Sequence, residues 1–223
     1  CADRARAWAG MQRVARRRGV DAFPLVQLQY HDNAHAGTGQ LLHTPPVPGV
    51  LKVSSTHAGY GKLVYRTRTE LDDALSVVAL GTDYFTLEPY YDNVEFEYRL
   101  QQIGRRAPRR WRRAFRRNSS NHWKNNTGNL TFSDHAWCAQ YDQWLDWVAD
   151  ELELDMFAID VLRLRDGAEV ILEVNDSAFG LRYEAEKEDL AHMRELAVAM
   201  LDDDDDDDDA APSAAGGAAD AAP

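Results

Sequence analysis

Asp160, Glu173 and Asn175 are the residues of this chain whose types best suit metal chemistry. Two carboxylates and an amide oxygen that converge from one face of a β-sheet are suitable ligands for a hard divalent cation such as Mg²⁺ or Ca²⁺. The alternative is a solvated sheet face that tolerates some repulsion between like charges. These three residues alone do not decide between the two interpretations.

A predicted β-hairpin brings these side chains together. Its strands are expected at Met156–Leu164 and Glu169–Val174, and the Asp166-Gly167 dipeptide between them favours a two-residue type I′ turn. In that register Asp160 lies directly opposite Glu173, with Cβ atoms roughly 4.5–5.5 Å apart. The amide two residues later points to the same face, whereas a slip of one residue would separate the acidic pair.

Lysines and glycines in the first third of the chain indicate a second kind of chemistry. Lys52 interrupts the apolar segment Val50–Val53, so it either extends to the rim of a sheet or meets an anion. The segment His57–Lys62 contains Gly59 and Gly61, which allow the backbone to approach a phosphate group closely. The loop does not match the Walker A pattern, and a glycine turn before a lysine is common, so this signal is weak alone.

Three further segments have polar patterns with a structural alternative each. Leu87–Tyr91 ends a predicted strand at a proline, which fits an adenine-binding backbone or an ordinary edge strand. Asn121–Gly128 is rich in anion-binding donors but has the composition of a turn. Arg105–Arg117 contains eight arginines with two aromatic residues, which fits a solvated or phosphate-facing strand better than a nucleic-acid site.

Composition limits the class of protein. A hydrophobic content of 44% fits a globular domain, and Asp202–Asp209 supplies most of the formal charge of −12. No apolar segment is long enough to span a membrane and no signal peptide opens the chain, so we expect a cytoplasmic protein. Only Cys1 and Cys138 are cysteines, which fits a reducing compartment. Zinc-ligand spacing and nucleophile–base arrangements are both poorly supported.

The periodicity predicts an α+β fold with largely antiparallel sheets. Helices are expected at residues 1–20, at Glu70–Leu80 with Thr69 as cap, from Ser133 onward, and at Glu186–Leu201 with Leu190, Met193, Leu196, Ala197 and Met200 facing inward. Strands are expected at Phe23–Tyr30, Val50–Val53, Leu63–Thr67, Phe85–Tyr91, Glu95–Ile103 and Trp111–Arg117, besides the hairpin, with His31–Pro48 as a loop.

Taken in order, these segments resemble the ATP-binding part of the synapsins, which have the ATP-grasp fold. The matching segments are FPL at 23–25, VLKVSSTHAGYGKLV at 50–64, LSVVAL at 75–80, LEPYYD at 87–92, WKNNTG at 123–128 and ILEVNDS at 171–177. The resemblance covers about residue 3 to 201, and its motifs are specific in combination. It implies two α+β lobes that clasp a nucleotide.

The resemblance also implies roles for individual residues. The nucleotide phosphates would contact Lys52, Lys62, Arg116 and Lys124, with Gly59 and Gly61 in a lid. The adenine hinge would comprise Glu88 and the backbone through Tyr90, with Asp92 near the ribose, while Asp160, Glu173 and Asn175 would hold Mg²⁺ or Ca²⁺.

Some features depart from the family pattern. Arg4 stands where a lysine is expected near the nucleotide, and Asp160 is shorter than the expected glutamate. The chain begins at Cys1 without a methionine, and we expect that most of the subdomain preceding ATP-grasp is missing.

We therefore expect three segments. They are a remnant of the preceding subdomain with a linker at 1–40, a synapsin-like ATP-grasp domain at 41–201, and a disordered acidic and Ala/Gly-rich tail at 202–223.

The function that the resemblance implies is binding of ATP with a divalent cation, in a regulatory or vesicle-associated assembly role. A homodimer and a peripheral vesicle or membrane surface are the further partners it suggests, and nucleic acid is not expected. The alternative is an ATP-grasp ligase that forms an acyl phosphate before an amine attacks. No catalytic residue is assigned.

Overall fold

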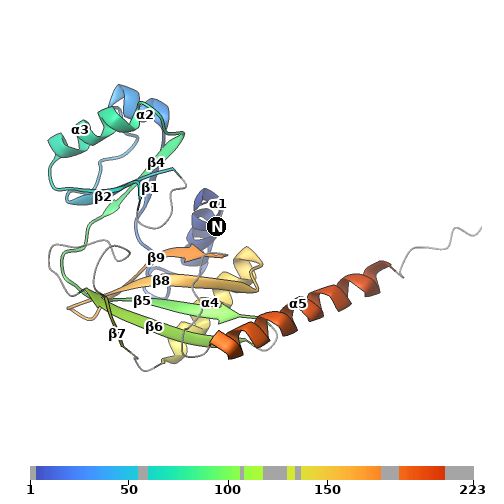
Figure 1. The fold of residues 1–223 in the computed structure, drawn as a ribbon. Coiled ribbons are helices and arrows are strands. Elements are labelled where there is room, and N and C mark those ends of the chain that lie inside the picture. Colours follow the sequence, from blue (N-terminus) through green and yellow to red (C-terminus); the bar gives the residue numbers. More distant parts are fainter. Residues whose placement is uncertain are drawn as a thin grey trace, which may run out of the picture. The chain divides into compact units, whose positions relative to one another are not determined.

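The computed structural model describes residues 4–54, 60–105, 108–117, 130–133, 137–176 and 186–208 (Figure 1). The chain divides into two units, Cys1–Gly180 and Leu181–Pro223, and each is described by itself. No helix among the described residues is long and apolar enough to cross a membrane.

The first unit contains two antiparallel sheets and four helices among its described residues, which confirms the predicted α+β class with antiparallel sheets. Its elements are α1 (Arg4–Arg18), β1 (Gln29–Asp32), α2 (Asn33–Thr38), β2 (Gly49–Val53), β3 (Lys62–Tyr65), α3 (Arg68–Val78), β4 (Tyr84–Pro89), β5 (Val94–Ile103), β6 (Arg109–Arg117), β7 (Leu130–Ser133), α4 (Ala139–Leu152), β8 (Met156–Leu164) and β9 (Glu169–Asn175). The described part of the second unit is α5 (Glu186–Asp208).

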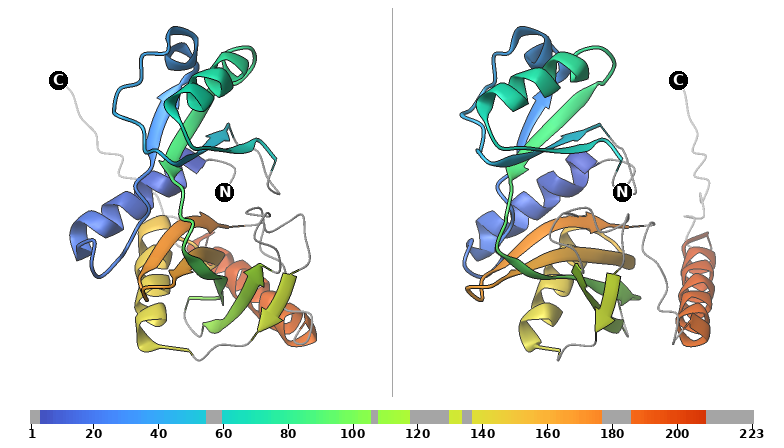
Figure 2. Two further views of the ribbon diagram at one scale, coloured as in Figure 1. Left: turned by 90° about the vertical axis from the view of Figure 1, so that its left-hand side faces the viewer. Right: turned by 60° about the vertical axis from the view of Figure 1, so that its left-hand side comes forward.

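The four-stranded sheet has the order β1-β4-β2-β3 and packs one face against α2 and α3 (Figure 2). Leu51, Phe85 and Leu87 belong to this core, together with Leu71 and Leu75 of α3. Because side chains alternate along a strand, the residues between them lie on the other face. That second face carries the polar residues of β2 and β4.

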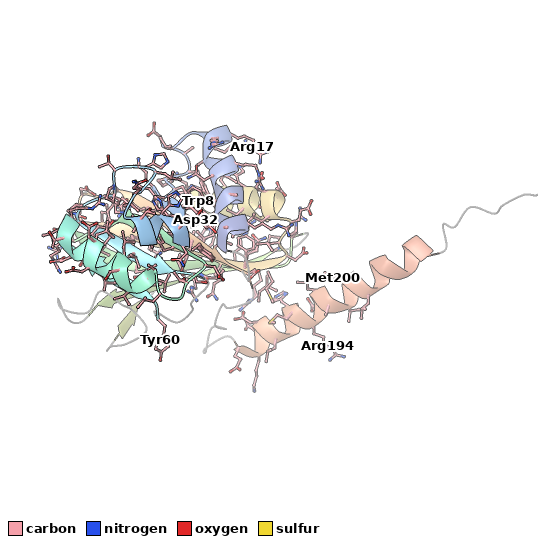
Figure 3. All side chains as sticks on the ribbon, turned by 90° about the horizontal axis from the view of Figure 1, so that it is seen from above. Trp8, Arg17, Asp32, Tyr60, Arg194 and Met200 are labelled. Atoms are coloured by element: carbon pink, nitrogen blue, oxygen red, sulfur yellow. The ribbon has the colours of Figure 1, made fainter. Side chains whose placement is uncertain are left out.

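The five-stranded sheet has the order β7-β6-β5-β8-β9, and its core is larger. Helices α1 and α4 lie side by side on one face of it, where Trp144 and Phe157 are fully buried (Figure 2). Arg17, labelled in Figure 3, forms an ion pair with Glu151 and so connects the two helices. The opposite face carries the polar residues of β5, β8 and β9.

The β8–β9 hairpin forms, but its turn differs from the predicted type. The Leu164 N–H donates to the Ala168 carbonyl at 2.9 Å, so three residues form the loop instead of two. Gly167 has φ of 90°, as the third residue of such a loop requires. This longer loop shifts the register by one residue, and a bulge between Asp160 and Val161 shifts it back.

Three predicted boundaries in the first unit are wrong. Thr67, not Thr69, caps α3, because its hydroxyl accepts from the Glu70 N–H at 3.1 Å in a capping-box pattern. The expected loop at His31–Pro48 contains the end of β1 and also α2, whose first turn is capped by Asp32. Ser133 ends β7 instead of beginning a helix, since this segment pairs with β6.

Two further expectations differ from the structure. The segment before β1 was expected to be a strand from Phe23, but only Leu25 forms an isolated bridge, to Ile171 of β9. In the second unit, Leu190 and Met200 belong to α5, which is described by itself, so the expectation that they face inward stays a prediction (Met200 is labelled in Figure 3). Helix α5 also continues to Asp208, since extending an existing helix gains one hydrogen bond per residue. Residues 209–223 of the acidic tail lie outside the described residues.

The neighbours of Gly49 leave no room for a side chain. We therefore expect Gly49→Ala to lower the free energy of unfolding by about 1–3 kcal/mol. A Cβ there would overlap the hydroxyl of the fully buried Tyr65 and lie 2.6 Å from the Pro46 carbonyl oxygen. Urea unfolding measures the effect. Gly37→Ala is the matched control, because nothing lies within 4 Å of its Cβ position. Equal destabilisation of both variants would contradict this account.

His31 makes the stability of the first unit depend on pH. Its side chain is fully buried against Phe85 at a ring distance of 5.1 Å. Burial lowers the pKa of His31 from 6.5, the charges of His35 and His43 lower it further, and Asp32 opposes them. The unfolded chain therefore binds more protons, and stability is lost as the pH falls through about 6.5.

We expect the free energy of unfolding to fall between about pH 7.5 and pH 5.5, and the fall to be smaller in His31→Phe. Urea unfolding at both pH values measures the difference. His192→Gln removes a more exposed histidine from α5 and should leave the dependence unchanged. A parent and a His31→Phe variant with the same pH dependence would show that His31 titrates normally.

Candidate functional site

The two carboxylates predicted to oppose each other do so. Asp160 on β8 pairs with Glu173 on β9, and Asn175 pairs with Ala158 farther along the same two strands. The flanking residues of β8 belong to the hydrophobic core, so the acidic pair lies on the other face of the sheet. The predicted pairing of Asp160 with Glu173 is confirmed, and the role of these residues as metal ligands stays a prediction.

Arg99, which the sequence reasoning missed, binds Asp160. It lies directly opposite Asp160 on β5, and its Nε and Nη2 atoms donate to Oδ1 at 2.6 Å and Oδ2 at 2.8 Å. Asn175 donates to Oδ2 at 2.9 Å. Because only 5% of Asp160 is exposed, this bidentate pair offsets the cost of a buried charge. The sequence feature that could have identified Arg99 is its position between the apolar residues Tyr98 and Leu100.

Lys52 and Lys62 face each other across β2 and β3. Like charges in directly opposed positions destabilise a sheet, so an anion is expected beside them. Lys52 is buried, and its Nζ atom lies 2.7 Å from Glu88 Oε1 on β4. Of the two alternatives for Lys52, the structure therefore shows contact with an anion, and that anion is a carboxylate of the protein.

Lys62 connects the residues of the two sheets. Its Nζ atom lies 4.0 Å from Glu173 Oε1, and both side chains are partly exposed. One lysine predicted to bind phosphate and one carboxylate predicted to bind metal therefore meet at this contact. A triphosphate with a bound cation needs such neighbouring groups of opposite charge.

Two buried oxygen atoms near the lysines have no hydrogen-bond partner among the described residues. They are Thr86 Oγ1 and Glu88 Oε2. Thr86 is the register partner of Lys52 on β4, and both are buried on the same sheet face. A buried acceptor or donor without a partner is costly, so these atoms mark a place where a polar ligand would improve the structure. Thr86 was not predicted as a site residue, although it alternates with the core residues of β4.

One backbone group of the expected adenine hinge is hydrogen-bonded within the protein. The Tyr90 N–H donates to the Pro48 carbonyl at 3.1 Å, so this N–H does not extend toward a purine edge. Burial, followed by the charge of Glu88, raises the pKa of Tyr91 above its usual value, which keeps its hydroxyl protonated.

Gly61 has φ of 63°, and its carbonyl accepts from the Val53 N–H at 2.8 Å, closing the loop between β2 and β3.

The remaining predicted site residues are not placed. Gly59 and Lys124 lie outside the described residues. The backbone of Arg116 lies in β6 opposite Thr131, and the structure describes no more of it than that.

The three predicted metal ligands have the atom types that a hard cation prefers. Among the described residues, no group of three or more histidine, cysteine, aspartate or glutamate side chains is arranged to hold a metal ion. Asp160, Glu173 and Asn175 supply two carboxylates and an amide, which suit Mg²⁺ or Ca²⁺. Since both oxygens of Asp160 accept hydrogen bonds from Arg99, the guanidinium already occupies part of the acceptor capacity of this carboxylate.

Two arginines of the basic segment have structural partners on α4. Arg110 donates to Gln102 Oε1 and to Asp142 Oδ1, each at 2.8 Å, and forms an ion pair with Asp146. Arg105 lies 3.3 Å from Asp150. Carboxylates of the protein therefore neutralise these two charges, which does not favour nucleic-acid binding.

Two comparisons of sequence identify relatives. A family model described as the synapsin ATP-binding domain matches residues 1–203. The synapsin of Drosophila melanogaster is 29% identical over 189 residues, which are 82% of this chain and 18% of the relative. The chain thus spans less than a fifth of the length of that relative.

Solved structures show the fold. An N5-carboxyaminoimidazole ribonucleotide synthetase in complex with ADP has a TM-score of 0.60 at 17% identity, covering 80% of this chain and 45% of its own. The D-alanine-D-alanine ligase of Coxiella burnetii has a TM-score of 0.58 at 15% identity, covering 88% and 57%. The fold is therefore ATP-grasp, as the sequence motifs imply, and likeness at this identity shows no more than the fold.

Arg110 and Arg105 provide a matched test of the basic segment. We expect Arg110→Met to lower the free energy of unfolding by about 1–3 kcal/mol, because it leaves partly buried acceptors without their charged donor. Arg105→Met removes an exposed pair and should cost at most about 0.5 kcal/mol. Thermal unfolding of both variants compares them. Salt-dependent RNA binding that either variant abolishes would restore the nucleic-acid interpretation.

Proposed function

The chain belongs to the synapsin family, and we propose that it binds ATP together with a divalent cation, Mg²⁺ or Ca²⁺, in a regulatory or vesicle-associated assembly role. The observation that carries the nucleotide site is the cross-strand pair Lys52 and Lys62, with Lys62 4.0 Å from Glu173. The assembly role and a homodimer are supported by the family alone.

Each part of the site has a task in this proposal. Lys52 and Lys62 bind the phosphates, and the backbone of Gly61 approaches them closely. Phosphate oxygens supply the anion that opposed lysines require, in addition to the carboxylate of Glu88. The cation supplies neutralisation of the phosphate charge when it is bound.

The remaining tasks follow the family pattern. Glu88 and the backbone through Tyr90 lie at the adenine. Arg116, Lys124 and Gly59 complete the phosphate site, and Asp160, Glu173 and Asn175 hold the cation. These assignments rest on the resemblance of the motifs.

We expect Lys62→Met to weaken ATP binding at least about tenfold, since it removes one charge-assisted contact to phosphate. Isothermal titration with ATP in excess Mg²⁺, and then in excess Ca²⁺, measures the affinity. Arg68→Met is the matched control, because its guanidinium pairs with Asp72 at 2.8 Å on the surface of α3. It should bind ATP as the parent does.

A second variant separates the cation from the nucleotide. Glu173→Gln should weaken the dependence of ATP affinity on the cation. Unchanged binding in both Lys62→Met and Glu173→Gln would refute the assignment of the site, and a parent chain that does not bind ATP would refute the function. ADP release with carboxylate and amine substrates in the same samples would favour the ligase alternative.

A further inference from the structure

A row of charged residues crosses three neighbouring strands on the face of the five-stranded sheet that is turned away from its core. Arg99 on β5 pairs with Asp160 on β8, and Asp160 pairs with Glu173 on β9. Lys62 of the other sheet lies 4.0 Å from Glu173. Each carboxylate of the acidic pair thus has a cation of the protein beside it, without any metal.

The contact between Arg99 and Asp160 is much closer than that between Lys62 and Glu173. The guanidinium bonds both oxygens of Asp160, at 2.6 Å and 2.8 Å. Those oxygens are the atoms that would coordinate a metal ion. A cation that binds Asp160 therefore shares its carboxylate with the guanidinium charge, and a cation that binds both oxygens competes with these charge-assisted hydrogen bonds.

The two partners of this pair differ in their freedom to separate. Asp160 is buried within the middle of β8 and receives an additional hydrogen bond from Asn175. The side chain of Arg99 is 27% exposed, and arginine has a long, flexible stem. Arg99 is therefore the group that would leave, while Asp160 stays in place.

We infer that Arg99 competes with the divalent cation for Asp160 and so sets the cation affinity of this site. The inference rests on the proposed function, because it concerns the cation that would accompany ATP. The free energy of the Arg99–Asp160 pair is subtracted from that of cation binding. Arg99 is in this sense a residue that tunes the site and need not contact the nucleotide.

Mn²⁺ is a suitable probe, because electron paramagnetic resonance measures its free concentration without nucleotide. Arg99→Met keeps an apolar stem of similar length and removes the competitor, so Mn²⁺ should bind at least about tenfold tighter than to the parent. Arg163→Met is the matched control. Arg163 lies on β8, the strand of Asp160, and pairs with Glu169 at 3.3 Å, so its loss removes the same charge without freeing Asp160.

The control should leave the Mn²⁺ affinity within about twofold of the parent, because the field of a distant exposed charge is screened. Equal tightening in Arg163→Met and Arg99→Met would show an effect of net charge and overturn the inference. An unchanged affinity in Arg99→Met would overturn it as well.

Arg99→Lys distinguishes direct competition from charge and protects the test against a variant that does not fold. Lysine keeps the charge but lacks the two-pronged donor geometry, so its Mn²⁺ affinity should lie between those of the parent and Arg99→Met. Circular dichroism establishes which variants are folded. If Arg99→Met is unfolded, tighter binding by Arg99→Lys supports the inference and parental affinity overturns it.

Titration of the parent with ATP in excess Mg²⁺ separates this inference from the proposed function. ATP binding by the parent, together with an unchanged Mn²⁺ affinity in the Arg99 variants, removes the inference alone. A parent that does not bind ATP removes the proposed function, whatever Mn²⁺ does.

Discussion

The opposition of Asp160 and Glu173 on adjacent strands is the constraint on which the arrangement of this site depends. Two carboxylates in directly paired positions repel each other, so the fold must place positive charge beside both. It does so from two directions, with Arg99 on the next strand of the same sheet and Lys62 on the other sheet. In the proposed function a divalent cation would meet the same requirement, since a cation neutralises both carboxylates at once. Internal counter-ions and an external cation are thus alternative solutions to one electrostatic problem.

The pairing of the two carboxylates could be predicted from the sequence, although the loop of the hairpin differs from the predicted two-residue turn. Asp166-Gly167 indicates a turn, and Gly167 does take positive φ, but the loop contains three residues. That difference alone would place Leu172 opposite Asp160. A bulge on β9 restores the pairing with Glu173, and it allows Ile171 and Val174 to face the core together. The sequence does not reveal the bulge, because Val170, Leu172 and Val174 are apolar at the regular spacing of an unbulged strand.

The first sheet shows which parts of a site local patterns can reveal. Lys52 stood out because it interrupts an apolar strand, and its burial beside Glu88 explains why the strand tolerates it. Thr86 did not stand out, since threonine is common in strands and has no charge to mark it. Its position next to Lys52 depends on the order β4-β2-β3, which sequence periodicity does not specify. The predicted start of α3 was wrong for a more local reason. The sequence contains the capping box that begins at Thr67, but Thr69, two residues later, is also an acceptable cap residue.

The arginines of this chain show why composition alone does not assign a function to charge. Arg110 lies in the segment with eight arginines, yet it binds Gln102 and the carboxylates of α4, and so connects β6 to the helix that covers the sheet. Arg99 lies outside that segment, and it binds Asp160 of the acidic pair. The two have the same chemistry and differ in the strand partner that the register gives them. Register in turn follows from the core, because burying the apolar face of β5 and β8 fixes which residues meet on the opposite face. The hydrophobic pattern of the strands therefore decides which charges meet in the candidate site.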